Sequence, residues 1–242
     1  MLSVKPIHTG SDGNLYIINN NSIFYFIDCG IDYKIIIKTL FKLNILISDI
    51  KGCFISHRHK DHSLSIKQIN KYMPVYSNND VFNSFSCNGK VLKSYNKFIL
   101  GELEIIPFNV EHGNIENYAY MFNDSKTGYK ILFITDVFKF DEILKPKFDE
   151  IFIECNWTRD LMLESLERTK GTPEYTKYER QYQTHMSLDS LKLILDKSID
   201  LSNCKKITLI HPSQEVCDKE LALNELRSIY PNIDIDFAKN II

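Results

Sequence analysis

Three histidines and an aspartate lie within six residues, His57-Arg58-His59-Lys60-Asp61-His62, directly after the β-prone run Lys51 to Ser56. Because side chains alternate along an extended segment, His57 and His59 are expected to point the same way. Asp61 and His62 then fall at the start of a following helix and can face a second position nearby. Imidazole and carboxylate groups suit Zn²⁺ and also allow Mn²⁺ or Fe²⁺. The alternative is a histidine-rich surface loop, and the tight spacing favours a metal site over it.

Further residues of the same types follow apolar runs elsewhere in the chain, namely His112, Asp136, His185 and His211. Asp136 comes directly after Ile131 to Thr135, and a carboxylate that emerges from a buried strand is costly unless it is paired or metal-bound. Each of these residues alone fits a hydrogen-bonded structural role at least as well as ligation. Together with the histidine cluster they favour ligation. The seventh histidine, His8, lies before Gly10, and whether it lines the site stays open.

The elements that must position these side chains can be read from the apolar patterns. β-Prone runs predict strands at 4–7, 15–19, 23–28, 51–56, 103–107, 118–123, 130–135, 150–154, 207–210 and 233–237. Helices are expected at 33–43, 63–72, 187–197 and near 215–229. A strand-rich beginning followed by strand–helix alternation indicates an α/β fold in which helices cover the outer faces of sheets.

Neither a repeat nor a linker interrupts the sequence, so a single domain over residues 1–242 is the simplest interpretation. The segment 157–184 is expected to be a helical insertion or a contact in a homodimer; a substrate lid or base-stacking platform is the alternative. The start of the sequence lacks a basic-then-apolar leader, and no apolar run approaches the roughly 18 residues of a membrane span. Six scattered cysteines without a CxxC pair agree with a reducing compartment. We therefore expect a cytoplasmic protein.

The spacing HxHxDH, a later lone histidine, an aspartate that ends a strand and a final histidine that ends another resemble the metallo-β-lactamase superfamily. The resemblance implies an αββα sandwich of two mixed β-sheets flanked by helices. It also implies two divalent metal ions, zinc first and manganese second. His57, His59 and His112 would bind one ion. The second would be bound by Asp61, His62 and His211, with Asp136 as the bridge. Asp28 matches an early aspartate that supports the ligand loop, although a turn or helix-cap role fits it equally well.

Two further segments resemble the phosphodiesterase branch of the superfamily. Phe152-Ile153-Glu154-Cys155-Asn156 and Thr184-His185-Met186-Ser187 are similar to the glutamate motif and the histidine loop of the tRNase Z group. The resemblance implies that His185 protonates the leaving oxygen, that Glu154 orients His185, and that Asp61 serves catalysis as well as metal binding. Gly10-Ser11-Asp12-Gly13-Asn14 and His211-Pro212-Ser213 are closer to the YycJ/WalJ group, which is associated with DNA exonuclease activity.

The expected function is hydrolysis of a nucleotide phosphodiester bond by a dinuclear metal site. The formal net charge is −2, so the sequence lacks the basic surplus of proteins that grip long nucleic acids. This favours a small cyclic nucleotide, as in the similar phage anti-Pycsar enzymes, which act against a host defence. A DNA or RNA nuclease of the YycJ/WalJ or tRNase Z kind is the alternative. Hydrolysis of a non-phosphate substrate comes next, and a binding scaffold without catalysis is disfavoured by the complete ligand set.

Overall fold

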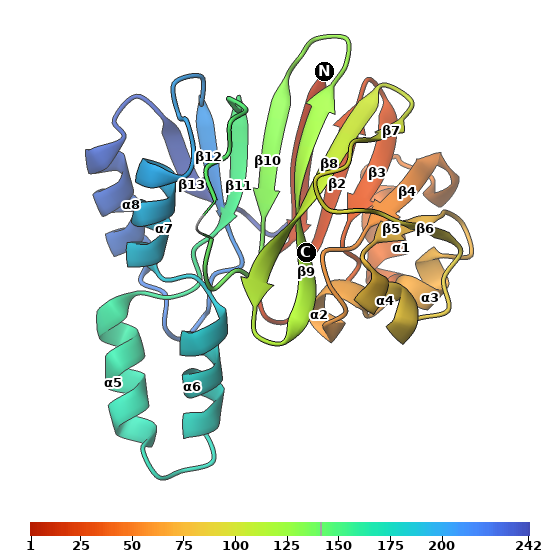
Figure 1. The fold of residues 1–242 in the computed structure, drawn as a ribbon. Coiled ribbons are helices and arrows are strands. Elements are labelled where there is room, and N and C mark those ends of the chain that lie inside the picture. The colour runs from red at the N-terminus through yellow and green to blue at the C-terminus, as the bar shows by residue number, and fades with distance from the viewer. Residues whose placement is uncertain (141) are drawn as a thin grey trace. The chain divides into compact units, whose positions relative to one another are not determined.

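The structure is a computed structural model that describes residues 1–140 and 142–242. Its strands form two sheets (Figure 1): six strands in the order β1-β2-β3-β4-β5-β6, and seven in the order β13-β12-β11-β10-β9-β8-β7. In the first sheet β1 to β3 pair antiparallel, whereas β3 to β6 pair parallel. The second sheet combines the antiparallel pair β7–β8 with the parallel strands β10 to β13. Both sheets are mixed and flanked by helices, as expected.

The bounds of the elements follow the chain in order. The strands are β1 (Leu2–His8), β2 (Leu15–Asn20), β3 (Ile23–Ile27), β4 (Ile50–Phe54), β5 (Val75–Ser77), β6 (Gly89–Val91), β7 (Phe98–Leu100), β8 (Leu103–His112), β9 (Ile115–Asp124), β10 (Lys130–Ile134), β11 (Glu150–Glu154), β12 (Lys206–Ile210) and β13 (Asp234–Phe237). The helices are α1 (Tyr33–Lys42), α2 (Lys60–Ser63), α3 (Ile66–Ile69), α4 (Asn79–Ser84), α5 (Arg159–Thr169), α6 (Tyr175–Thr184), α7 (Leu188–Lys197) and α8 (Lys219–Ile229), with a 3-10 turn at Ile47–Asp49.

The chain divides into two compact units. The first comprises Met1–Asn109, Ile115–Lys130 and Lys239–Ile242, and the second comprises Val110–Asn114 and Ile131–Ala238. The domain organisation over residues 1–242 stays a prediction. The segment 157–184 holds α5 and α6, which lie side by side as a helical hairpin in the second unit (Figure 1, teal).

The first unit is layered around its six-stranded sheet. Ile36 and Leu40 of α1 and Ile69 of α3 are buried in one core with strand residues from that sheet. In another part of this unit, an aromatic core joins Phe54 of β4 to β9, with ring centroids 5.8 Å from Tyr120 and 5.6 Å from Phe122. This layering has two causes. The helices carry a stripe of apolar residues at helical spacing, and the strands are buried on both faces.

The second unit is organised by parallel strands with buried sequences. Every residue of β11 is buried, as are Ile131 to Ile134 of β10. Strands buried on both faces read as continuous apolar runs, so this part of the sequence could be recognised directly. The chain leaves the ends of β10, β11 and β12 at Thr135, Cys155 and His211, which places several polar residues just beyond buried strands.

The structure corrects three details of the expected elements. The helix expected at 63–72 is two single turns, α2 and α3, because Ser65 leaves helical geometry and its hydroxyl donates to the Ile31 carbonyl at 2.6 Å. The last helix begins at Lys219 rather than near Glu215, since the Asp218 side chain accepts from Leu221 N as its N-cap. The short strands β5, β6 and β7 were not expected; each has three residues.

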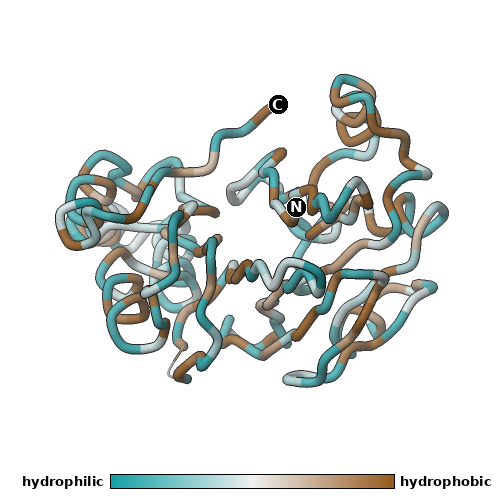
Figure 2. Tube along the Cα trace, turned by 90° about the horizontal axis from the view of Figure 1, so that it is seen from above, coloured by the Kyte–Doolittle hydropathy of each residue, from teal (hydrophilic) through white to brown (hydrophobic). Residues whose placement is uncertain are grey.

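Apolar residues are interspersed with polar ones along the trace (Figure 2). Within residues 1–140 and 142–242, no helix has both the length and the apolar character needed to cross a membrane. All six cysteines are free, and Cys53 and Cys155 are buried.

Candidate metal centre

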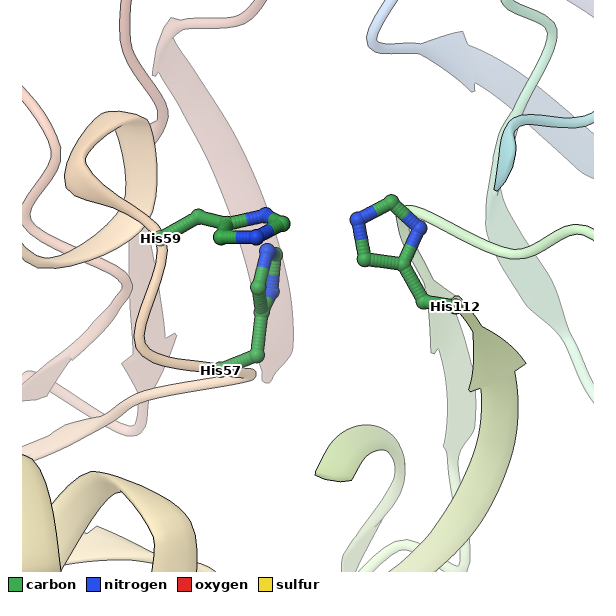
Figure 3. A group of neighbouring side chains, drawn as sticks. All are labelled: His57, His59 and His112. Atoms are coloured by element: carbon green, nitrogen blue, oxygen red, sulfur yellow. The ribbon is translucent and has the colours of Figure 1, made fainter. Parts of the chain in front are cut away.

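The histidine cluster of the first unit forms the loop after β4 and the start of α2. His57 is buried and His59 is exposed at the N-terminal cap of α2. Their rings meet edge to face with centroids 4.7 Å apart, in agreement with side chains that point the same way. Figure 3 shows these two histidines on the loop and His112 at the end of β8.

Asp28 supports this loop through hydrogen bonds. Its carboxylate is fully buried, accepts hydrogen bonds from Ser56 N at 2.8 Å and Ser56 Oγ at 3.0 Å, and lies 2.7 Å from His62 Nδ1. A carboxylate on Nδ1 places the proton there and leaves the lone pair on Nε2 of His62. Asp28 has φ 57, a conformation that few residues other than glycine, asparagine and aspartate adopt readily. The interpretation of Asp28 as a plain turn or helix cap therefore gives way to a supporting role.

A second set of contacts fixes the Asp61–His62 turn. Asn14 N donates to the Asp61 carbonyl at 2.7 Å, and Asn14 Nδ2 lies 3.1 Å from His62 Nε2. Cys29 N donates to the His62 carbonyl at 2.8 Å. Gly30 packs so closely on this peptide that an added Cβ would lie 1.6 Å from the Asp61 carbonyl oxygen. Hydrogen bonds and close packing from residues 14 and 28–30 thus hold the start of α2 in place.

In the second unit, His112 ends β8 and is buried. Its Nδ1 donates to the carbonyl of Thr184 at 2.8 Å, so Nε2 carries the lone pair. Burial lowers the pKa of His112 to about 4, despite the opposing effect of the Asp136 carboxylate, and the ring is therefore neutral at pH 7. A neutral imidazole with one nitrogen anchored by a carbonyl is the form that binds transition metals.

Asp136 lies between two imidazoles of this unit. It follows β10 with φ 52, and Thr135 Oγ1 donates to its Oδ2 at 2.7 Å. Oδ1 lies 3.7 Å from His112 Nε2, whereas Oδ2 lies 3.6 Å from His211 Nε2. These separations are longer than hydrogen bonds. They are close to the roughly 3 to 3.5 Å between two ligands that bind one Zn²⁺ at about 2.0–2.1 Å. The donor atoms therefore fit divalent metal ions, with Asp136 offering one oxygen to each side.

Glu154 contacts two histidines at once. Its Oε1 lies 2.7 Å from His185 Nδ1 and 3.2 Å from His211 Nδ1, while Oε2 accepts from Val137 N at 2.8 Å and Met186 N at 3.2 Å. The two rings are stacked, with centroids 5.2 Å apart and an angle of 7° between their planes. Burial alone would raise the pKa of Glu154, but the neighbouring imidazoles hold it below its ordinary value. Glu154 is thus an anion that anchors Nδ1 of both rings.

The structure brings together four titratable site residues of the second unit. One ligand atom from each of Asp136, Glu154, His185 and His211 lies within 4.8 Å of the others. The remaining candidates divide by unit: His57, His59, Asp61 and His62 belong to the first and His112 to the second. His8 of the first unit, whose role the sequence left open, is paired with Asp12 at 3.0 Å between His8 Nε2 and Asp12 Oδ1.

Solved structures resemble this chain over nearly its whole length. YhfI from Bacillus subtilis, a metallo-β-lactamase fold protein, superposes with a TM-score of 0.75 at 15% identity, covering 99% of this chain and 96% of that one. Unliganded yeast PDE1 gives a TM-score of 0.69 at 13% identity, covering 99% and 98%. The short form of human tRNase Z gives 0.65 at 14% identity, covering 99% and 97%.

This chain has the metallo-β-lactamase fold. No protein-family model matches it. Among curated proteins, it is 27% identical to the exodeoxyribonuclease YycJ of Bacillus anthracis over 146 residues, which are 56% of this chain and 54% of that protein. The match thus spans about half the length of that relative.

Within this metallo-β-lactamase fold, the sequence alone did not reveal the supporting contacts. Ser56 bridges Asp28 and the ring nitrogens His57 Nδ1 at 3.0 Å and His62 Nδ1 at 3.2 Å. Asn156 Nδ2 donates to the His211 carbonyl at 2.8 Å. Ser56 and Asn156 each stand one or two residues from a recognised motif residue, which was the available signal. Asp28 lies 28 residues from Ser56 and His211 lies 55 residues from Asn156, so spacing could not identify these two contacts.

Proposed function

We propose that the protein is a metal-dependent phosphodiesterase that hydrolyses nucleotide phosphodiester bonds. The observation that carries this proposal is the His185–Glu154 pair beside Asp136 in the second unit. His185 keeps 16% of its side chain exposed, whereas Glu154 is fully buried. A reachable imidazole with a buried carboxylate behind it is suited to proton transfer at the substrate.

The metal ligands are assigned in two sets, following the family resemblance. His57, His59 and His112 would bind one ion; Asp61, His62 and His211 would bind the other, and Asp136 would bridge them. The neutral form of His112, the anchored Nδ1 atoms of His62 and His211, and the two oxygens of Asp136 support the assignment. Imidazole with few carboxylates favours zinc over manganese.

When bound, the two ions would activate water for attack and neutralise charge on the phosphate oxygens. The chain's own residues would do the rest. Glu154 holds Nδ1 of His185 and so presents Nε2 toward the substrate, where it would donate a proton to the leaving oxygen. Asp61, at the start of α2, would act as both ligand and catalytic residue.

A small substrate such as a cyclic nucleotide is supported by the charges of the α5–α6 hairpin. Lys177 of α6 pairs with Glu215, and Arg159 of α5 lies 2.9 Å from Asp189. Basic side chains that are matched by acids contribute little to gripping a phosphate backbone. This agrees with the net charge of −2.

DNA is the second candidate substrate, because the curated relative is an exodeoxyribonuclease. The resemblance to the YycJ/WalJ group around Gly10 to Asn14 and His211 to Ser213 supports it as well. A cyclic nucleotide and a DNA end both contain a phosphodiester bond, so the proposed mechanism applies to either substrate. The two substrates differ in the groups that surround the reacting phosphate.

The test is a substrate panel with purified, zinc-loaded protein: cyclic mononucleotides, cyclic dinucleotides, single- and double-stranded DNA, and RNA. We expect turnover of at least one member, together with loss of turnover in His59→Ala. Turnover of cyclic nucleotides alone supports the small substrate, and release of mononucleotides from DNA ends supports the exonuclease. If every diester stays intact while a lactone or thioester is hydrolysed, the phosphodiesterase proposal is wrong.

A further inference from the structure

The C-terminal end of α6 contacts all three histidines of the second unit, either directly or through one residue. The Thr184 carbonyl accepts from His112 Nδ1 at 2.8 Å, and the Gln181 carbonyl accepts from His185 N at 3.1 Å. The Gln181 side chain donates from Nε2 to Asn156 Oδ1 at 2.6 Å. Asn156 in turn holds His211. The helical hairpin is therefore joined to the candidate centre by specific bonds as well as by packing.

Asn156 has a partner for each of its polar groups. It is 1% exposed. Its N–H donates to the Met186 carbonyl at 3.0 Å, and its own carbonyl accepts from Ser213 N at 2.9 Å. Nδ2 donates to the His211 carbonyl at 2.8 Å, and Oδ1 accepts from Gln181. Because Gln181 supplies a donor, the Asn156 amide is locked with its nitrogen toward His211. A flipped amide would set Oδ1 against the His211 carbonyl oxygen.

His211 needs such support because its backbone is strained. It has φ 53, in the left-handed region that a residue with a bulky side chain rarely occupies. The hydrogen bond from Asn156 ends on the carbonyl of this strained residue, so it stabilises the backbone conformation that directs the ring. Glu154 Oε1 holds the ring itself at Nδ1, 3.2 Å away. The direction in which the ring leaves the backbone therefore depends on Asn156.

We propose that Gln181 is a positioning residue for the metal centre, acting through Asn156 on His211. This rests on the ligand assignment in the proposed function. Gln181 lies 25 residues from Asn156 in the sequence and belongs to a different element. Without this hydrogen bond the Gln181 side chain would serve α6 through packing, for which many side chains of similar size suffice. The hairpin thereby becomes part of the metal-binding apparatus.

The test compares Gln181→Leu with Gln183→Leu, which makes the same change two residues along α6 at an exposed position. Zn²⁺ affinity is measured by chelator competition, and the Co²⁺-loaded proteins are compared by visible absorption. We expect Gln181→Leu to bind one of two ions about 10- to 100-fold more weakly, the usual effect of losing a residue that orients a ligand. Its Co²⁺ spectrum should change, and Gln183→Leu should match the wild type in both.

Thermal unfolding without metal separates positioning from packing. If Gln181 positions His211, the melting temperature of the metal-free protein should be close to that of the wild type in both variants. The double variant Asn156→Ala/Gln181→Leu should bind metal no more weakly than Asn156→Ala alone, because the two residues act in series. If Gln181→Leu does not fold, Gln181→Glu keeps the length of the side chain without the donor and should show the same loss.

Unchanged metal affinity and spectrum in Gln181→Leu, or an equal loss in Gln183→Leu, would overturn the proposal. A lower metal-free melting temperature with unchanged affinity would likewise reduce Gln181 to a packing residue. The proposed function fails in a different way: a wild-type protein that binds two ions and cleaves no diester refutes the activity alone. The affinity comparison is unaffected by that outcome.

Discussion

At the scale of single residues, the fixed His185–Glu154 pair leads to a prediction about the leaving group. His185→Ala should keep its metal ions and lose on the order of 10²–10⁴ in rate on a natural diester, the usual scale of general acid catalysis. The loss should be smallest for bis-p-nitrophenyl phosphate, because p-nitrophenolate leaves without a proton. Steady-state rates on the two substrates and metal analysis of the same sample check this.

Glu154→Gln serves as the graded comparison for that experiment. It removes the charge that anchors Nδ1 of His185 and leaves the imidazole in place, so a milder version of the same leaving-group pattern is expected. Loss of a metal ion from His185→Ala would instead make His185 a ligand. An equal loss on both diesters would argue against proton donation.

The buried Asp28 leads to a second prediction at this scale. Asp28→Asn keeps a side chain that tolerates φ 57 but replaces the carboxylate that faces His62 Nδ1. We expect affinity for one ion to fall about 10- to 100-fold, measured by chelator competition. The matched control is Asp32→Asn, at the exposed N-cap of α1, which should leave metal affinity unchanged. Equal affinities in the wild type and Asp28→Asn would remove Asp28 from the support of the loop.

At the scale of elements, Gly30 shows how one segment holds another. An alanine Cβ at this position would meet the backbone of Asp61 at 1.6 Å, so the start of α2 would have to move. We expect Gly30→Ala to destabilise the fold by about 3 kcal/mol or more, or to prevent folding. Gly128→Ala, in a turn with φ 71 and open space around the added Cβ, should cost only about 1 kcal/mol. Urea unfolding of both variants measures the difference, and equal costs would show that the contact can relax.

The elements also show what the sequence could and could not predict. The long apolar runs of β10, β11 and β12 identified buried strands, and the polar residues directly after them became the site candidates. Strands of three residues, such as β5, are too short for alternation to show. Contacts such as Gln181 with Asn156 join elements that are distant in the sequence, and no local pattern encodes them. The spacing of residues identified candidate metal ligands. The role of each ligand came from the family resemblance.

At the scale of the whole molecule, charge decides what size of substrate is expected. The 29 Lys and Arg residues are outnumbered by 31 Asp and Glu. In the α5–α6 hairpin, Arg159 is paired with Asp189 and Lys177 with Glu215. A protein that neutralises many phosphates releases many counterions, and its affinity then falls steeply with salt.

We therefore expect affinity for the preferred diester to depend weakly on salt, with a slope of log affinity against log salt of about one or less, as for a single phosphate contact. Inhibition of bis-p-nitrophenyl phosphate hydrolysis by each candidate substrate, measured from about 50 to 200 mM KCl, gives this slope. A short DNA duplex and a cyclic mononucleotide should be compared in the same assay. If the duplex gives a slope of several units and the tighter binding, many phosphates are held at once, and the exonuclease replaces the cyclic-nucleotide hydrolase as the function of this site.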